Sequence, residues 1–340
     1  MSSVQRPRGR HRAMSPRRKV RLRRTLLVTG ALLAVAVLAG VMIPAMRLQG
    51  SLETAPLRAG TDEADPLPTD GMNILVLGSD SRDLTSGNFE QGDGSKRSDS
   101  LMVVHLAEDD DRIDVVQIPR DTVLELPACA DAGRGEAPSR RGMINSALNY
   151  GPACSVRAAE ELTGVGIDHF VEVDFDGFAD IIDALGGIPV HLEETLQDPF
   201  ADLDLPQGDQ VLDGYQALAW ARTRHAVGDG SDIARLDHQK EVIDAIANTV
   251  RHDGVLNRPD RLYSFLDAVI ASLTVDDDLG SVRALATLAT RVSHVDQDDI
   301  TIVTMPWEPA PGDPNRVVPS ADAEDVFTSL TEDVPLPAQA

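Results

Sequence analysis

The sequence predicts an α/β protein: a single three-layer αβα domain with a central mixed sheet, preceded by one N-terminal transmembrane helix. Three observations predict it. An uncharged apolar run lies near the N-terminus, short apolar segments alternate with segments of helical period after it, and 42% of the 340 residues are apolar. That apolar content can form a core and excludes wholesale disorder, while such alternation is typical of a sheet covered by helices.

The two ends of the chain differ in charge. Residues 1–24 hold ten basic residues and no acidic one, whereas the remainder holds 21 basic and 55 acidic residues, a net charge of −34. The whole chain carries −24, which argues against a general nucleic-acid binder, because such proteins are basic overall. We therefore expect no nucleic-acid partner.

The uncharged run covers residues 25–46. As a helix it would be about 33 Å long, enough to cross the hydrocarbon core of a bilayer. The apolar region of a cleaved signal peptide is shorter, about 7–15 residues, so a retained signal-anchor is favoured, although the small residues near Met46 leave cleavage open. The basic flank predicts a cytoplasmic N-terminus and a single-pass protein whose remaining chain lies outside the cell membrane.

These patterns divide the chain into five regions. They are a basic cytoplasmic arm (1–24), the transmembrane helix (25–46), a linker with three prolines (47–70), an extracellular catalytic domain (71–332) and a tail (333–340). Within the domain, apolar runs predict strands at 73–80, 100–106, 113–119, 169–175, 188–192 and 301–307. Helical patterns fall at 145–163, 176–185, 213–221, 232–251, 259–272, 279–293 and 322–330. Residues 309–319 are expected to be irregular.

Two cysteines, Cys129 and Cys154, lie outside the membrane in this topology. Disulfides persist in that compartment, so a bond between them is favoured over two free buried thiols. It would restrain the segment that contains Arg134, Arg140 and Arg141.

Arginine and aspartate residues gather where the predicted strands end. The segments are GSDSR with Asp80 and Arg82, KRSDS with Arg97 and Asp99, and IPRD with Arg120 and Asp121. Ligands bind outside strand ends in open α/β sheets, and two carboxylates there could hold Mg²⁺. The alternatives are that Asp80 and Asp99 only cap turns, and that Arg120 and Asp121 form a solvated surface ion pair.

A further basic group follows the helix predicted at 213–221. Arg222 and Arg224 would share one side of an extended segment, where two guanidinium forks suit a pyrophosphate. In the next predicted helix, Arg235 and Gln239 fall on one face with Asp232. The alternatives are that Arg222 and Arg224 are two solvated surface arginines, and that Asp232 simply caps the start of its helix.

Seven segments now stand in order along the chain. They are GSDSR, RSD, IPRD, NSALNYG, IDHFVEVDFDGFADIIDALGGIPV, LDGYQALAWARTRH and DIARLDHQ. Together they resemble the LytR-CpsA-Psr family of membrane-anchored wall enzymes, over residues 72–308. Three departures are a long segment between Asp80 and Asp99, Met143 where the family often has lysine, and His238 where it commonly has a second arginine.

The resemblance implies a phosphotransferase that moves a phosphate-linked glycopolymer from a polyprenyl-pyrophosphate carrier to a peptidoglycan sugar hydroxyl. It makes Asp80 and Asp99 the ligands of Mg²⁺ (or Mn²⁺), with Asp121 in a supporting role. A carboxylate near the metal could take the proton of the acceptor hydroxyl, and Asp99 and Asp121 are the candidates for this general base. The pyrophosphate-binding set that the resemblance implies is Arg82, Arg97, Arg120, Arg222, Arg224, Arg235 and Gln239. A hydrolase of the same pyrophosphate and a non-catalytic envelope regulator are the competing functions.

Overall fold

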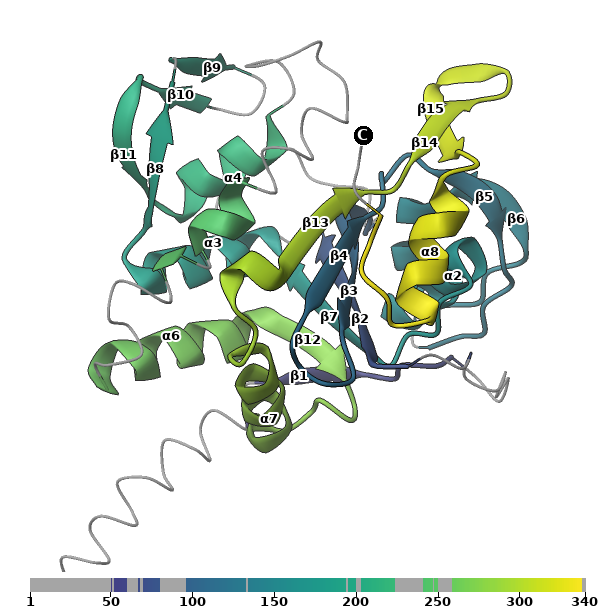
Figure 1. Ribbon diagram of the computed structural model, residues 1–340, viewed down its shortest axis with the longest axis horizontal. Coiled ribbons are helices and arrows are strands. Elements are labelled where there is room, and N and C mark those ends of the chain that lie inside the picture. Colours follow the sequence, from purple (N-terminus) through teal and green to yellow (C-terminus); the bar gives the residue numbers. More distant parts are fainter. Residues whose placement is uncertain are drawn as a thin grey trace, which may run out of the picture. The chain divides into compact units, whose positions relative to one another are not determined.

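A computed structural model of the protein describes residues 50, 52–59, 67, 70–79, 96–132, 134–193, 195–199, 203–223, 241–246, 248–249 and 259–337 (Figure 1). They belong almost entirely to one compact unit, Ser51–Ala340. The predicted transmembrane helix at 25–46 lies outside the described residues. Within those residues, no helix is both long and apolar enough to span a membrane.

A mixed seven-stranded sheet forms the centre of this unit, which confirms the predicted α/β class with a central mixed sheet. Its strand order is β1-β12-β7-β2-β3-β4-β13. The strands are β1 Glu53–Ala55, β12 Leu273–Asp276, β7 His169–Asp174, β2 Met72–Ser79, β3 Ser98–Leu106, β4 Ile113–Gln117 and β13 Ile300–Thr304. The pairs β1–β12, β2–β7 and β4–β13 are parallel, and the remaining three pairs are antiparallel.

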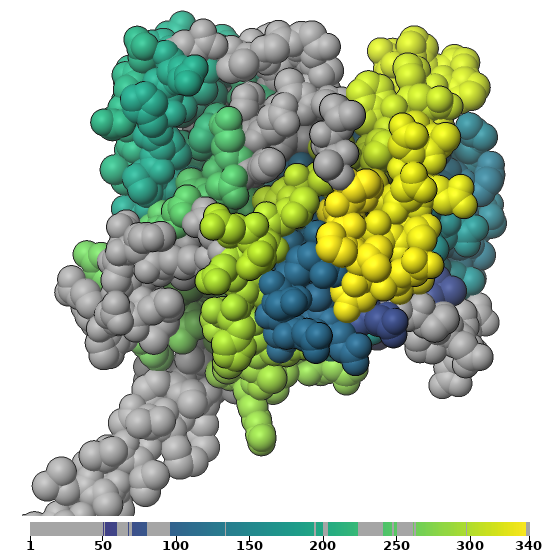
Figure 2. Space-filling view, in the orientation of Figure 1, coloured from purple at the N-terminus to yellow at the C-terminus, as the bar shows by residue number. Residues whose placement is uncertain are grey.

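Alternation along the strands builds the main core on one face of the sheet. Leu75 and Leu77 of β2 and Leu101 and Val103 of β3 point to this face and are fully buried. Three helical elements cover it: η1 (Ile144–Tyr150), α2 (Pro152–Thr163) and α8 (Ala323–Thr331). In the space-filling view α8, in yellow, lies against the blue residues of this region (Figure 2).

The opposite face carries a smaller apolar cluster, which includes Ile113 and Val115 of β4 and Val295. Helix α7 (Val282–Val292) precedes Val295, and its Arg291 Nε donates a hydrogen bond to Asp110 at 2.7 Å. Side chains therefore pack on both faces of the sheet. This arrangement agrees with helices on either side of a central sheet.

A second group of elements follows β7 and has its own apolar cluster. Helix α3 (Phe175–Leu185) packs against α6 (Pro259–Ser272) and α4 (Gly214–Arg222). Asp174 caps α3 by accepting from the Gly177 N–H, and Asp213 caps α4 in a capping box with Gln216. Gly214 allows α4 to approach closely, because a Cβ there would lie 2.2 Å from the Ala179 carbonyl oxygen.

Short strands complete the described structure. A hairpin of β8 (Ile188–Leu192) and β11 (Gly208–Leu212) accompanies a pair formed by β9 (Leu196–Asp198) and β10 (Leu203–Leu205). Elsewhere β5 (Val123–Leu126) pairs with β6 (Arg140–Met143), and η2 (Gln297–Asp299) precedes β13. The strand predicted at 188–192 therefore exists but lies outside the central sheet.

Two predicted elements differ in the structure. The single helix expected at 145–163 is divided into η1 and α2, because Gly151 has φ +106°, a value that a helix interior does not allow. Residues expected to be irregular form the hairpin of β14 (Trp307–Ala310) and β15 (Asp313–Pro319). Its turn contains Gly312 at φ +86°.

Parts of the predicted linker and tail belong to the folded unit. In the predicted linker, β1 extends the sheet edge and Arg58 Nη2 donates to Glu160 Oε1 at 2.7 Å. In the predicted tail, Asp333 accepts from Arg112 and His105, and Leu336 packs against the main core. Neither segment has a periodic pattern, so only its contacts with distant residues order it.

The disulfide prediction is confirmed. Cys129 and Cys154 are bonded, with their Cα atoms 5.7 Å apart. The bond joins the segment after β5 to the start of α2.

A histidine–aspartate pair links β7 to β12. His169 Nδ1 lies 3.1 Å from Asp276 Oδ1, and the buried Asp276 also accepts from the Phe170 N–H. The hydrogen bond with Asp276 raises the pKa of His169 above 6.5, although burial opposes the rise. Burial would raise the pKa of Asp276, but the bonds from His169 and the backbone outweigh it and lower that pKa below 3.8.

We expect the pair to stabilise the fold most between pH 3.8 and 6.5. The histidine's contribution is complete below its unfolded pKa and is lost as the pH rises through the raised value. The aspartate's contribution is lost as the pH falls through the lowered value. Urea unfolding of wild type and His169→Gln should therefore differ more at about pH 5.5 than at about pH 8.5. A difference that grows with pH would contradict this, and His191→Gln, at an exposed ring, is the control.

Candidate functional site

Four strands of the sheet meet at one end, where the sequence places its Arg–Asp segments. Strand β2 ends at Ser79, which pairs both with Ser98 at the start of β3 and with Asp174 at the end of β7. Beyond the end of β4, the Ile118 N–H donates to the Leu101 carbonyl at 2.8 Å. The structure therefore brings Arg97, Asp99, Arg120 and Asp121 to one sheet end, as predicted.

Asp99 occupies a β-bulge. Gly78 pairs with Ser100 and Ser79 with Ser98, so Asp99 has no partner residue across β2. A bulge adds one residue to a strand and redirects a side chain, and such bulges are frequent beside active sites. The bulge was not predictable from local sequence, because it depends on the register between two strands.

Arg120 forms the centre of the described site. Its Nη1 donates to Asp99 Oδ1, and its Nε lies 3.9 Å from Asp121 Oδ2. All three side chains are less than a fifth exposed, at 19%, 15% and 18%. The loop that carries Arg120 is held by Thr122 Oγ1, which donates to the Pro119 carbonyl at 2.6 Å. Arg120 is thus a cation with a set orientation before any ligand arrives.

Arg316 also reaches this loop, from β15. Its Nη1 lies 3.2 Å from Asp121 Oδ1, and the Val317 N–H donates to the Asp121 carbonyl at 3.4 Å. Arg316 is not predictable as a site residue from local sequence, because it lies in a stretch expected to be irregular and far along the chain. Asp121 therefore lies between two guanidinium groups.

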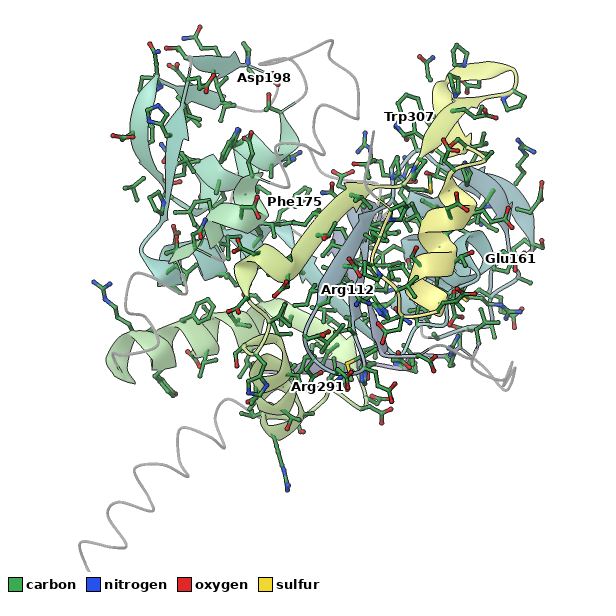
Figure 3. All side chains as sticks on the ribbon, viewed as in Figure 1. Arg112, Glu161, Phe175, Asp198, Arg291 and Trp307 are labelled. Carbon is green, nitrogen blue, oxygen red and sulfur yellow. A yellow bond between two sulfur atoms is a disulfide. The ribbon has the colours of Figure 1, made fainter. Side chains whose placement is uncertain are left out.

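Arg222 lies at the same sheet end through an aromatic contact. Its guanidinium carbon is 4.5 Å from the centre of the Phe175 ring, and Phe175 directly follows Asp174 at the end of β7. Figure 3 marks Phe175 in this region. Helix α4 ends at Arg222, and Thr223 is extended, with its hydroxyl donating to Asp198 at 2.6 Å. An extended Thr223 is the conformation that the predicted pairing of Arg222 with Arg224 requires.

The asparagines of NSALNYG brace the site. The Asn145 N–H donates to the Arg120 carbonyl at 3.4 Å, and Asn149 Oδ1 accepts from the Lys96 N–H at 2.9 Å. Arg97, next to Lys96, is exposed. The remaining predicted site residues lie outside the described residues; they are Asp80, Arg82, Arg224, Arg235 and Gln239.

Oxygen donors surround the bulge. Ser79 Oγ and Ser98 Oγ are buried and have no hydrogen-bond partner within the described structure, and the Asp99 carboxylate follows Ser98. Carboxylate and hydroxyl oxygens suit a hard cation such as Mg²⁺, so the residues fit the predicted metal. Among the described residues, no group of three His, Cys, Asp or Glu side chains could hold a metal ion, and Asp80 is not one of them.

The fold is an α/β domain in which Arg120, Arg222 and Arg316 lie at one end of the central sheet. The model of the LytR_cpsA_psr family matches residues 49–332, so the chain belongs to that family. It is 29% identical over 262 residues to the cell wall biosynthesis protein LcpA of Corynebacterium glutamicum, covering 69% of this chain. The chain spans only about half of that relative, 49% of its length.

Other relatives match over more of their length. The chain is 28% identical to the polyisoprenyl-teichoic acid–peptidoglycan teichoic acid transferase TagU of Oceanobacillus iheyensis, over 77% of this chain and 76% of that protein. Among solved structures, a LytR-Csp2A-Psr enzyme from Actinomyces oris has a TM-score of 0.62 at 22% identity, over 83% of this chain and 97% of that one. TagT bound to LI-WTA has a TM-score of 0.55 at 21% identity, over 82% and 95%. These structures share the fold.

Proposed function

We propose that this chain is a phosphotransferase that moves a phosphate-linked glycopolymer from a polyprenyl-pyrophosphate carrier to a sugar hydroxyl of peptidoglycan. The observation that carries the proposal is Arg120, oriented by Asp99 at the bulge and set at the same sheet end as Arg222. Family membership supports it, as does a relative named as a teichoic acid transferase acting on peptidoglycan.

The arginines bind the negatively charged pyrophosphate and stabilise the charge that develops during transfer. Arg120 and Arg222 bind the pyrophosphate, together with Arg82, Arg97, Arg224, Arg235 and Gln239. The acceptor hydroxyl oxygen bonds to the phosphorus that carries the polymer, and the bond from that phosphorus to the polyprenyl phosphate breaks. Negative charge grows on the departing polyprenyl phosphate, and oriented guanidinium groups stabilise it because they need no reorganisation. The hydroxyl proton passes to a carboxylate, Asp99 or Asp121.

Asp80 and Asp99 would hold Mg²⁺ (or Mn²⁺), with the hydroxyls of Ser79 and Ser98 nearby. When bound, the ion would neutralise pyrophosphate charge. Replacement of Asp80 by asparagine should remove both activity and its dependence on Mg²⁺, measured by titrating Mg²⁺ into metal-stripped protein.

We also propose that residues 25–46 anchor the protein in the cell membrane, with residues 1–24 in the cytoplasm and the catalytic domain outside. The uncharged run and its basic flank support this topology. A reporter fused after residue 340 should be active only outside the membrane. Release of the chain into the medium after cleavage near Met46 would contradict a retained anchor.

The test of the function is a transfer assay with a lipid-pyrophosphate-linked sugar. A transferase attaches the sugar to a peptidoglycan fragment and releases no free sugar phosphate without that acceptor. Sugar phosphate released equally with and without the acceptor would instead indicate a hydrolase. Binding of the lipid-linked sugar without either product would indicate a regulator.

Replacing Arg222 by lysine is expected to lower transfer by about tenfold or more, because lysine keeps the charge but loses the two-pronged hydrogen bonding. Phe175→Leu is the matched variant: it removes only the ring beneath the guanidinium, a contact worth about 0.5–1 kcal/mol at exposed sites. Its loss of activity should therefore be a few-fold. Equal losses of activity in the two variants would show that the contact with the ring, rather than the two-pronged hydrogen bonding of the guanidinium, supports transfer.

A further inference from the structure

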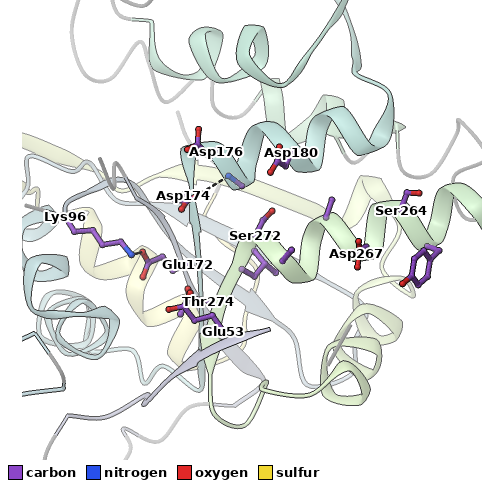
Figure 4. A pocket seen from close by; sticks show the side chains of 15 residues that line it. Glu53, Lys96, Glu172, Asp174, Asp176, Asp180, Ser264, Asp267, Ser272 and Thr274 are labelled. Carbon is purple, nitrogen blue, oxygen red and sulfur yellow. Dashed lines mark hydrogen bonds and ion pairs between the residues drawn. The ribbon is translucent and has the colours of Figure 1, made fainter. Parts of the chain in front are cut away.

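An acidic cleft lies beside the proposed active site. It has a volume of about 610 Å³ and is bordered by the end of β7, the start of α3, the last turns of α6, and residues of β1 and β12 (Figure 4). Among the described residues, one cation, Lys96, lines it together with six carboxylates: Glu53, Glu172, Asp174, Asp176, Asp180 and Asp267. This excess of negative charge favours a cationic ligand.

Glu172 lines the cleft and has one unsatisfied acceptor atom. The residue is 3% exposed, and its Oε1 is paired with the Lys96 ammonium. Its other oxygen, Oε2, is buried and has no hydrogen-bond partner within the described residues. A buried carboxylate oxygen without a donor is costly, so a donor from a ligand in the cleft would stabilise it.

Helix α3 adds further charge. Asp176 and Asp180 come from its first two turns and line the cleft together with Asp267 of α6 (Figure 4). Burial raises the pKa of Asp176, and the carboxylates of Asp174 and Asp180 raise it further. A bound cation would relieve that repulsion. Asp174 is already engaged, since it accepts from the Gly177 N–H at 2.7 Å.

The size of the cleft and the arrangement of its carboxylates favour an organic cation over a metal ion. No three carboxylates of the described residues are arranged to hold a metal, and the cleft is far larger than one ion. Glu172 already accepts one ammonium, that of Lys96. Tyr263 of α6 lines the same cleft with a partly exposed ring, and a ring face attracts ammonium groups.

We propose that this cleft binds a ligand that carries primary ammonium groups on an aliphatic chain, with one ammonium donating to Glu172 Oε2 and the remainder facing Asp176 and Asp180. Ammonium binding does not depend on the transfer activity. The source we assign, the amino-bearing peptide of the peptidoglycan acceptor, does rest on the proposed function. It fits the location, because Asp174 pairs with Ser79 of the candidate site. A free polyamine is the other source of the same chemistry.

The first experiment is calorimetric titration of the full-length chain in detergent with 1,5-diaminopentane, and with its diacetylated form as the neutral control. The diamine should bind, and acetylation should weaken binding by about tenfold or more. Glu172→Gln should weaken it by a similar factor, again about tenfold. Asp209→Asn, at a side chain of β11 that is 93% exposed, should change nothing.

A second variant protects the test against misfolding, because Glu172→Gln also removes the partner of Lys96. The double variant Asp176→Asn and Asp180→Asn leaves that ion pair intact and should weaken diamine binding severalfold at an unchanged melting temperature. Equal binding by all variants, or displacement of the diamine by Mg²⁺ or Ca²⁺ alone at lower concentration, would overturn the proposal.

The second arm separates the two sources. A muropeptide with a free side-chain amino group should displace the diamine, and its N-acetylated form should not. If neither displaces it, the acceptor peptide is excluded while ammonium binding stands. If displacement succeeds but the transfer assay yields no product, the proposed function fails while the cleft assignment survives.

Discussion

Replacing Arg120 by lysine is expected to lower glycopolymer transfer by about ten- to a hundredfold, with little change in the melting temperature. The Arg120 guanidinium donates to Asp99 and lies 3.9 Å from Asp121 at the same time. The lysine ammonium is a single point charge on a flexible stem, so it cannot maintain these directions together. The measurement is transfer of the lipid-linked sugar to a peptidoglycan fragment, beside thermal melts of each variant.

Arg141→Lys is the matched control for this substitution. The Arg141 side chain is 61% exposed and lies 4.0 Å from Glu125, a surface pair that contributes little. It should transfer at the wild-type rate. An Arg120→Lys protein that transfers normally, or that loses activity only because it unfolds, would show that Arg120 is structural and that the anion site lies elsewhere.

Loss of the Cys129–Cys154 bond is expected to have the largest effect on stability. The cysteines are 25 residues apart in the sequence, and a cross-link of that span stabilises by about 3 kcal/mol in the chain-entropy model. The double variant Cys129→Ala and Cys154→Ala should therefore melt roughly 6–12 °C below wild type. Both cysteines are buried in the main core, so part of the loss comes from packing.

Reduction separates these two contributions. Wild-type protein treated with a reductant keeps both sulfur atoms in the core but loses the cross-link. Its melting temperature should therefore fall by most of the amount by which the double variant falls below wild type. Intact-mass measurement after alkylation should show two modified thiols only when reductant is present. Equal melting temperatures of the reduced and the oxidised protein would contradict a stabilising role of the disulfide.

Local patterns were sufficient to predict the main layout of the domain. Apolar alternation such as that of Leu75 and Leu77 predicted strands, because one face of a half-buried strand must be apolar. The Arg–Asp segments predicted that Asp99, Arg120 and Asp121 would lie at strand ends. Strand ends on one side of a sheet are neighbours whatever the sequence between them, so this prediction needed no detailed register.

Contacts between distant segments were beyond such patterns. The bulge at Asp99 depends on the register of β3 against β2, and the approach of Arg316 to Asp121 depends on a hairpin that packs beside the site. Strand β1 is ordered only because the edge of β12 is there to pair with it. The acidic cleft likewise joins α3, α6 and three strands that no single segment brings together.

The sequence by itself therefore determined the α/β class, the family and the sheet end at which charged residues gather. Each of these follows from periodicity within a segment or from the order of motifs along the chain. Tertiary structure alone decided that Asp99 is paired with Arg120, that Arg222 lies over Phe175, and that one buried oxygen of Glu172 has no donor among the described residues. The physical reason is that pairing and burial depend on how separate elements pack, which local side-chain preferences do not specify.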